Sequence, residues 1–99
     1  MTKKQARTFS LKFFRVIWEP QFQATKPELA PKVNRQVSPA VERNRVKRII
    51  REFFRKHVEF FQPGRWVFIA KSAVTRASNR EVFADLERIL ASIQKKSFM

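Results

Sequence analysis

The segment AVERNRVKRIIREFF, residues 40–54, constrains the fold most, because it combines an apolar stripe with a run of like charges. At about 100° per residue, a helix gathers its large apolar side chains on one side. These are Val46, Ile49, Ile50, Phe53 and Phe54. From residue 43 to residue 56, seven positive side chains accompany one acidic side chain, Glu52. Such a helix must bury its stripe against a second layer and present its charges to a polyanion.

The flanking segments predict strands for that second layer. Residues 7–18, RTFSLKFFRVIW, are rich in aromatic and β-branched residues and predict a strand that is bent or bulged near Phe13. Alternation over residues 33–37 predicts a second, shorter strand. Residues 65–71, RWVFIAK, form a continuous apolar run of strand length.

Two helices are predicted on either side of this last strand. Ser38-Pro39 is a favourable start for the basic helix, which we expect to run to about His57 and to end before a Pro63-Gly64 turn. Residues 78–81, SNRE, fit the capping box that begins a second helix. Its apolar stripe is Val82, Phe83, Leu86, Ile89, Leu90 and Ile93. The order of strands, helix, strand and helix predicts one sheet with helices packed on one face.

The charge of the whole chain narrows the class of partner. Among 99 residues, 22 Lys and Arg stand against 8 Asp and Glu, which gives a net charge of +14. That field favours a nucleic acid or an anionic membrane. With 43% hydrophobic residues, the chain has enough apolar material for one domain over residues 1–99, and we expect residues 1–6 to be disordered. No cysteine and no apolar run of signal-peptide or membrane-span length occur, so we expect a cytoplasmic protein.

The basic helix should present two polar surfaces. Four residues lie beside the apolar stripe and should face the sheet edge: Arg43, Asn44, Lys47 and Arg51. Two others should point further outward: Arg45 and Arg48. The amide of Asn44 both donates and accepts, so it can read a base edge or a 2′-hydroxyl. Because like charges at i, i+4 repel within the helix, we interpret this surface as a nucleic-acid interface rather than a solvated face.

Aromatic residues of the predicted sheet are candidates for stacking on RNA bases. If Phe9, Leu11 and Phe13 pack under the helices, the alternating set on the other face is Phe14, Val16 and Trp18. The sequence leaves open which face is exposed. The single histidine falls within the apolar arc of the basic helix and is interpreted as a packing residue. With one histidine and no cysteine, no metal-dependent nuclease site is predicted on the protein.

Residues 33–55, VNRQVSPAVERNRVKRIIREFFR, resemble the most characteristic stretch of the bacterial ribonuclease P protein subunit. In that family, a strand ending in V-S-K-K-V leads into A-V-x-R-N-R-x-K-R-x-x-R. The polar positions match one for one: Arg43, Asn44, Arg45, Lys47, Arg48 and Arg51. A weaker likeness continues to residue 93. Family members usually begin with a helix, but here the strand pattern starts by residue 7, so we expect that helix to be absent.

The resemblance implies an α+β fold: a two-layer α/β sandwich, ribosomal protein S5 domain 2-like, with one sheet, helices on one face and a left-handed βαβ crossover through the basic helix. It also implies a noncatalytic RNA-binding subunit of an endoribonuclease, ribonuclease P, that assists a catalytic RNA in removing the 5′ leader from precursor tRNA. The partners are then the catalytic RNA and precursor tRNA, and we expect a monomeric protein. No cofactor is expected on the protein alone, and Mg²⁺ is expected in the RNA active site.

The resemblance also assigns roles to residues. Three arginines are implied to contact the catalytic RNA: Arg45, Arg48 and Arg35. Four residues are implied to border a cleft, floored by the sheet, that receives the leader: Arg43, Asn44, Lys47 and Arg51. To this second set we add the candidate stacking residues Phe14, Val16 and Trp18.

Three other interpretations compete. A DNA-binding basic region continues into leucine heptads, whereas this helix meets a Pro-Gly turn. A membrane-surface helix leaves its apolar face for lipid, whereas the flanking strands indicate that this face is used inside a domain. We therefore expect neither DNA nor a membrane as partner. A ribosomal or other structured-RNA-binding protein without a role in cleavage is the closest alternative.

Overall fold

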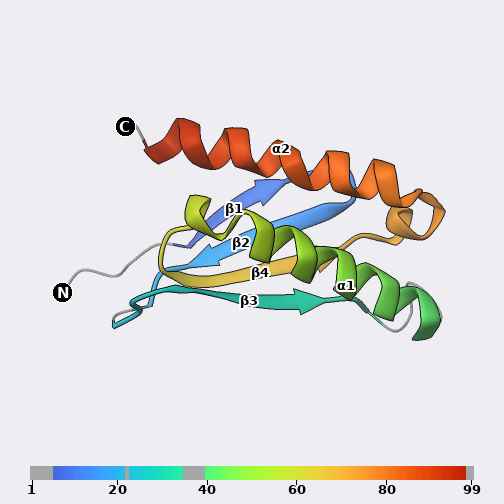
Figure 1. Cartoon of the computed structure of the whole chain (residues 1–99), viewed down its shortest axis with the longest axis horizontal. Helices are drawn as coiled ribbons and strands as arrows, with labels where there is room; N and C mark the ends of the chain where they lie inside the picture. Colours follow the sequence, from blue (N-terminus) through green and yellow to red (C-terminus); the bar gives the residue numbers. More distant parts are fainter. Residues whose placement is uncertain (1–5, 22, 35–39, 98–99) are drawn as a thin grey trace.

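A four-stranded sheet and two helices form two layers (Figure 1). The computed structural model describes residues 6–21, 23–34 and 40–97, so residues 1–5, for which disorder is predicted, lie outside the described residues. The strands are β1 (Arg7–Ser10), β2 (Phe14–Glu19), β3 (Pro27–Lys32) and β4 (Gly64–Ala70). The helices are α1 (Ala40–Lys56) and α2 (Asn79–Ser97), with short 3-10 turns η1 (Val58–Phe60) and η2 (Ser72–Arg76). Both long helices cover the same face of the sheet, as predicted.

The strands lie in the order β1-β2-β4-β3. β2 is antiparallel to β1 and β4, whereas β3 and β4 are parallel. α1 therefore connects two neighbouring parallel strands. In Figure 1, α1 lies in front of the sheet, both strands point to the right, and β4 lies above β3, so the crossover is left-handed. Such connections are right-handed in about 98% of cases, and the unusual hand implied by the family resemblance is confirmed.

The prediction of one bent strand over residues 7–18 is wrong, because this segment forms the β1–β2 hairpin. The chain reverses after β1, and the N–H of Leu11 donates to the carbonyl oxygen of Phe14 at 2.8 Å. Phe9 then lies opposite Val16, and opposite residues of an antiparallel pair share one face. The turn thus brings the apolar residues of both halves under the helices.

The prediction of a strand over residues 33–37 is wrong for Val33 and Asn34, which follow the strand of this region, and its other residues are not described. β3 ends at Lys32, and residues 35–39, which include the predicted helix start, lie outside the described residues. β3 occupies an edge of the sheet beside β4. An edge strand has one side without ladder hydrogen bonds, so it tolerates Pro27 and Pro31. Because proline is rare in strands, β propensity alone does not predict a strand over these residues.

The predicted turn at Pro63-Gly64 is confirmed, and it requires glycine. Gly64 has a φ of 131°, a conformation that side chains with a Cβ rarely adopt. A Cβ here would lie 2.6 Å from Trp18 Nε1 and 2.9 Å from the carbonyl oxygen of Glu19. The indole N–H of Trp18 donates to the carbonyl oxygen of Pro63 at 3.1 Å. The turn therefore places the start of β4 beside the end of β2.

Both predicted helical stripes pack against the sheet. The five stripe residues of α1 are all buried. On α2, Phe83 and Leu90 are half-buried at the margin of the core, and the other four members are buried. The sheet contributes Phe9, Phe14, Val16, Trp66, Phe68 and Ala70. The core is thus largely aromatic on the sheet side and aliphatic on α2.

The capping box predicted at the start of α2 is confirmed. The N–H of Ser78 donates to Glu81 Oε1 at 2.8 Å, and the N–H of Glu81 donates to Ser78 Oγ at 3.2 Å. The hydrogen bond from the Ser78 backbone, followed by that of the Ser78 side chain, holds the pKa of the Glu81 carboxyl below its usual value. Both bonds satisfy backbone donors that the helix itself cannot pair.

Asp85 is a buried acid that ties α2 to the β1–β2 hairpin. Its residue exposure is 4%. Oδ1 accepts the N–H of Lys12 at 3.0 Å, and Oδ2 accepts the N–H of Phe13 at 2.7 Å. The guanidinium of Arg88 also lies 3.3 Å from Oδ1. One carboxylate therefore satisfies two amides of the turn that places both apolar sets under the helices.

We expect Asp85→Ala to lower the free energy of unfolding by about 2–4 kcal/mol, because two turn amides lose their acceptor. Glu87→Ala removes one negative charge from an exposed position on the same helix and should change it by less than about 0.5 kcal/mol. Urea unfolding followed by circular dichroism measures both. Equal effects of the two substitutions would contradict the tethering role of Asp85.

Candidate nucleic-acid interface

The candidate interface is the exposed surface of α1. Because its apolar stripe is buried, the basic residues occupy its two flanks and its outer crest. α1 packs against both β3 and α2, so one flank faces each of these elements. A nucleic acid lying along α1 therefore meets positive charge on both sides of one helix.

Helical periodicity and the contacts of α1 divide its polar residues into two sets. We call Arg43, Lys47 and Arg51 the β3 flank, because they lie on the side of the stripe away from α2. Arg43 and Lys47 are half-buried, and Arg51 is exposed. We call Arg45, Arg48 and Glu52 the α2 flank, because these three residues line a groove beside α2.

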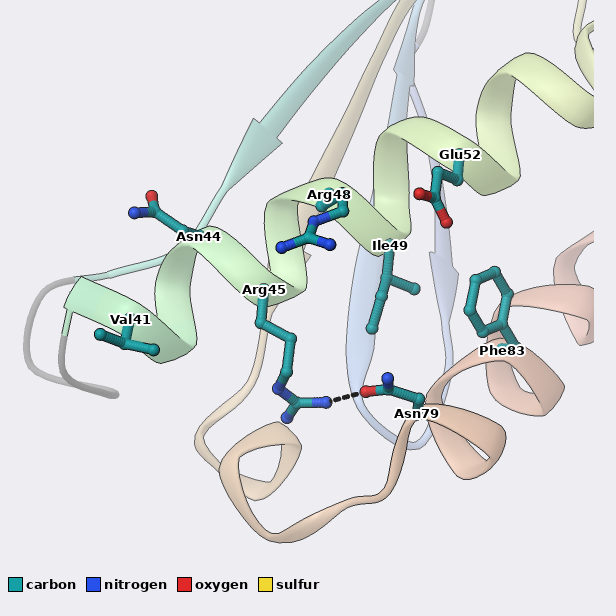
Figure 2. Close-up of a pocket in the computed structure, with 8 residues that line it drawn as sticks. All are labelled: Val41, Asn44, Arg45, Arg48, Ile49, Glu52, Asn79 and Phe83. Atoms are coloured by element: carbon teal, nitrogen blue, oxygen red, sulfur yellow. Dashed lines mark hydrogen bonds between the residues drawn. The ribbon is translucent and has the colours of Figure 1, made fainter.

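That groove, which we call the interhelix groove, has a volume of about 580 Å³ (Figure 2). Ile49 points between the helices, Phe83 rises from α2 to face Glu52, and Arg45 reaches Asn79 at one end. The groove thus has apolar and aromatic surfaces inside and polar groups around its rim. Its full lining is Val41, Asn44, Arg45, Arg48, Ile49, Glu52, Asn79 and Phe83.

Arg45 bridges α1 to the start of α2. Its guanidinium donates to Glu42 Oε1 at 2.9 Å, to Asn79 Oδ1, and to the carbonyl oxygen of Ala77 at 3.4 Å. The Arg45 side chain is 25% exposed. The prediction that Arg45 shares the outward orientation of Arg48 is therefore wrong. The start of α2 supplies acceptors that lie more than thirty residues away in the sequence.

The other members of the predicted set for the catalytic RNA divide into described and undescribed residues. Arg48 is exposed, as predicted. Arg35 lies outside the described residues. Asn44 is exposed and lines the interhelix groove together with Arg48. Asn44 thus lies on the outer crest of α1 at the edge of the groove, and its predicted place beside Arg43, Lys47 and Arg51 stays a prediction.

Phe14, Val16 and Trp18 do not form an exposed stacking surface. Phe14 and Val16 are fully buried, and Trp18 is half-buried. Their predicted contact with the leader through an open sheet face is wrong, because the hairpin turns both apolar sets under the helices. The Trp18 ring lies 5.9 Å from that of Trp66, and the guanidinium of Arg7 lies 5.6 Å from its centre.

The helix-free face of the sheet offers different chemistry. Within the described strands it carries no aromatic side chain, because the alternate positions of β2 and β4 are aliphatic or charged. Ile17 lies opposite Val67 on this face. Arg15 and Lys32 are exposed there, on either side of Ile69. This face therefore lacks the stacking platform that single-stranded RNA uses on many sheets.

The sequence points to α1 but not to the residues that face it. Phe83 fits the apolar stripe of α2, and Asn79 fits the capping segment, so neither is marked as functional. Glu52 stands out only as the one acid among seven positive side chains over residues 43–56. The opposite charge of Glu52 among these cations is the sequence signal that could have identified it as a candidate functional residue.

The described residues contain no group of three or more His, Cys, Asp or Glu side chains that could hold a metal ion. The ring of His57 packs 4.8 Å from that of Phe53, which agrees with its predicted packing role. Among the described helices, none has the length and apolar content needed to cross a bilayer.

The family model and the curated relatives that match this sequence all belong to one family. The sequence model of the family described as Ribonuclease P matches residues 1–94. The ribonuclease P protein component of Pseudoalteromonas atlantica is 36% identical over 62 residues, which cover 63% of this chain and 52% of the relative. That of Thioalkalivibrio sulfidiphilus is 41% identical over 54 residues, covering 54% and 45%. The chain thus spans about half the length of the curated relatives it matches.

Solved structures share the fold. A Staphylococcus aureus RNase P protein, solved as a mutant with defective mRNA degradation activity, has a TM-score of 0.83 at 23% identity, covering 91% of this chain and 76% of that chain. The RNase P protein from Thermotoga maritima has a TM-score of 0.72 at 24% identity, covering 87% and 82%. At these identities the likeness is one of fold.

The two arginines of the α2 flank should differ in their effect on stability. We expect Arg45→Ala to lower the free energy of unfolding by about 1–2 kcal/mol, because Asn79 and Ala77 lose a charged donor. Arg48→Ala should change it by less than about 0.5 kcal/mol, since Arg48 is exposed and bridges no described element. Urea unfolding of both variants tests this difference. Matching losses would mean that the bridge contributes nothing.

Proposed function

The chain belongs to the ribonuclease P protein family, and from this premise we propose that it is an RNA-binding subunit of ribonuclease P. In this role it binds a catalytic RNA and assists it in removing the 5′ leader from precursor tRNA. The protein is itself noncatalytic. Mg²⁺ ions held in the RNA active site supply the Lewis acid and the activated water for cleavage.

One observation carries the proposal: α1 buries its apolar stripe and keeps positive charge on both flanks. The net charge of +14 attracts any polyanion, but charge alone does not organise two RNA contacts. A helix that is charged on two sides can contact two nucleic-acid segments at once. This is what a subunit needs when it must hold a substrate against a catalytic RNA.

We assign the two flanks to different RNAs. The β3 flank borders the sheet edge, and its three cations hold phosphates of the precursor tRNA leader. Arg48 on the α2 flank contacts the catalytic RNA, and Arg35, just before α1 in the sequence, belongs to the same contact. Arg45 supports that contact by bridging the two helices. Asn44, at the boundary of the groove, can accept a hydrogen bond from a base or a 2′-hydroxyl.

The first test of this function is the salt dependence of RNA binding. Six or more phosphate contacts imply that log K falls against log salt with a slope of about −4 to −6. Titration of the purified protein with a structured RNA between low and moderate salt gives this slope by fluorescence anisotropy. A slope near −1 would contradict an extended phosphate contact along α1.

The second test separates the two flanks. We expect Lys47→Ala with Arg51→Ala to weaken precursor tRNA binding by reconstituted holoenzyme at least about tenfold, because two phosphate contacts are lost. Binding of mature tRNA, which lacks the leader, should change little. The control is Arg15→Ala with Lys32→Ala, which removes two charges from the helix-free face and should affect neither tRNA.

Equal weakening of both tRNAs by the Lys47 and Arg51 substitutions would show that α1 is one undivided electrostatic surface. Holoenzyme assembly is measured in the same experiment, by titrating each variant into the catalytic RNA and following precursor cleavage at limiting Mg²⁺. Arg48→Ala should raise the protein concentration needed for half-maximal cleavage. If the unmodified protein binds the RNA without stimulating cleavage, it is a structured-RNA-binding protein of another kind.

A further inference from the structure

The interhelix groove contains an acidic side chain that phosphate binding does not explain. Glu52 is exposed and makes no ion pair or hydrogen bond with any described residue, although Arg48 and Lys56 lie four positions away on either side. A carboxylate on a helix is normally stabilised by such i, i+4 partners. Its side chain instead points toward Phe83 across the groove (Figure 2). A negative charge in this place repels the phosphates that the rest of α1 attracts.

The lining of the groove suits a flat ligand that carries hydrogen-bond donors. The volume of about 580 Å³ is in the range of small-ligand sites, about 300–1,000 Å³. Ile49 and the ring of Phe83 supply apolar surface, on which a heteroaromatic ring can pack. An ionised carboxylate only accepts hydrogen bonds. Glu52 therefore selects for a ring edge with N–H groups.

Among nucleobases, guanine fits this pattern best. Its Watson–Crick edge presents two adjacent donors, N1–H and the N2 amino group, which match the two oxygens of one carboxylate. Adenine and cytosine present an exocyclic amino group beside an acceptor, and uracil presents one N–H between two acceptors. An unstacked base of a loop or bulge exposes this edge to protein side chains. Arg48, at the rim of the groove, is placed to neutralise the phosphate of the same nucleotide.

We propose that the interhelix groove binds one unstacked guanine of a structured RNA, with Glu52 reading its Watson–Crick edge and Phe83 packing against the base. This inference rests on the proposed function, because it names the RNA feature that the α2 flank recognises. Arg45 and Asn79 keep the end of the groove closed through their hydrogen bond, so the site exists before RNA arrives. Val41, which is 77% exposed, lies beyond Arg45 at this end of the groove.

The test uses the full chain and three RNA hairpins that differ in one bulged nucleotide: guanine, inosine or adenine. Inosine keeps N1–H and lacks the 2-amino group. The protein should bind the guanine hairpin about tenfold more tightly than the adenine hairpin, with inosine between them. Anisotropy titrations at physiological salt give the three dissociation constants.

Glu52→Gln is the decisive variant, because the amide replaces one acceptor with a donor and removes the negative charge. It should reduce the preference for guanine to about twofold or less, while adenine binding becomes no weaker. The matched control is Glu59→Gln, which removes the same charge from an exposed position in η1 outside the groove. It should leave the order of the three hairpins unchanged.

Three outcomes overturn the inference. The first is equal tightening of all hairpins by both variants, which would make Glu52 an ordinary surface charge. The second is tight binding by the unmodified protein without a preference for guanine, which leaves the proposed function standing. The third is failure to bind any of the hairpins or the catalytic RNA, which overturns the proposed function as well.

Discussion

Burial of the α1 stripe against the sheet is the constraint on which the rest of the structure depends. A helix with seven positive side chains over residues 43–56 is weakened by repulsion among its own charges. Tertiary packing must therefore stabilise it. Phe54 packs 4.6 Å from Phe61, and Phe53 packs 6.2 Å from the same ring. Because the stripe fixes the rotation of α1 about its axis, it also decides which cations face β3 and which face α2.

Local patterns in the sequence predicted the helices well. The stripes, the capping box and the Pro63-Gly64 turn depend on residues within a few positions of one another, so their physics is visible in the sequence. The strands are harder to predict from the sequence. The reversal after Ser10, for example, is stabilised by Asp85, which lies more than seventy residues away. The position of β3 is mispredicted for a related reason. Its prolines are compatible with a strand only if the strand lies at the edge of the sheet, and the sequence does not show this.

The candidate site shows the same division between local and non-local information. The basic surface of α1 follows from its sequence alone. The behaviour of individual side chains does not, because Arg45 finds its acceptors at Ala77 and Asn79. Glu52 likewise acquires an aromatic neighbour, Phe83, only when α2 is in place. A motif therefore locates the candidate interface, whereas tertiary packing decides which of its charged side chains bind to neighbouring residues of the protein.

The prolines of β3 also bear on how this protein avoids associating with itself. β3 pairs with β4 along its whole length, from Pro27 opposite Gly64 to Lys32 opposite Ile69, so the proline nitrogens belong to the outer side. The outward-facing backbone positions of β3 are 27, 29 and 31. Because positions 27 and 31 are proline, only position 29 has an N–H to donate to an incoming strand. Exposed edges otherwise template intermolecular pairing and aggregation. The outer edge of β3, beside the β3 flank of α1, therefore offers few backbone donors to a second polypeptide chain.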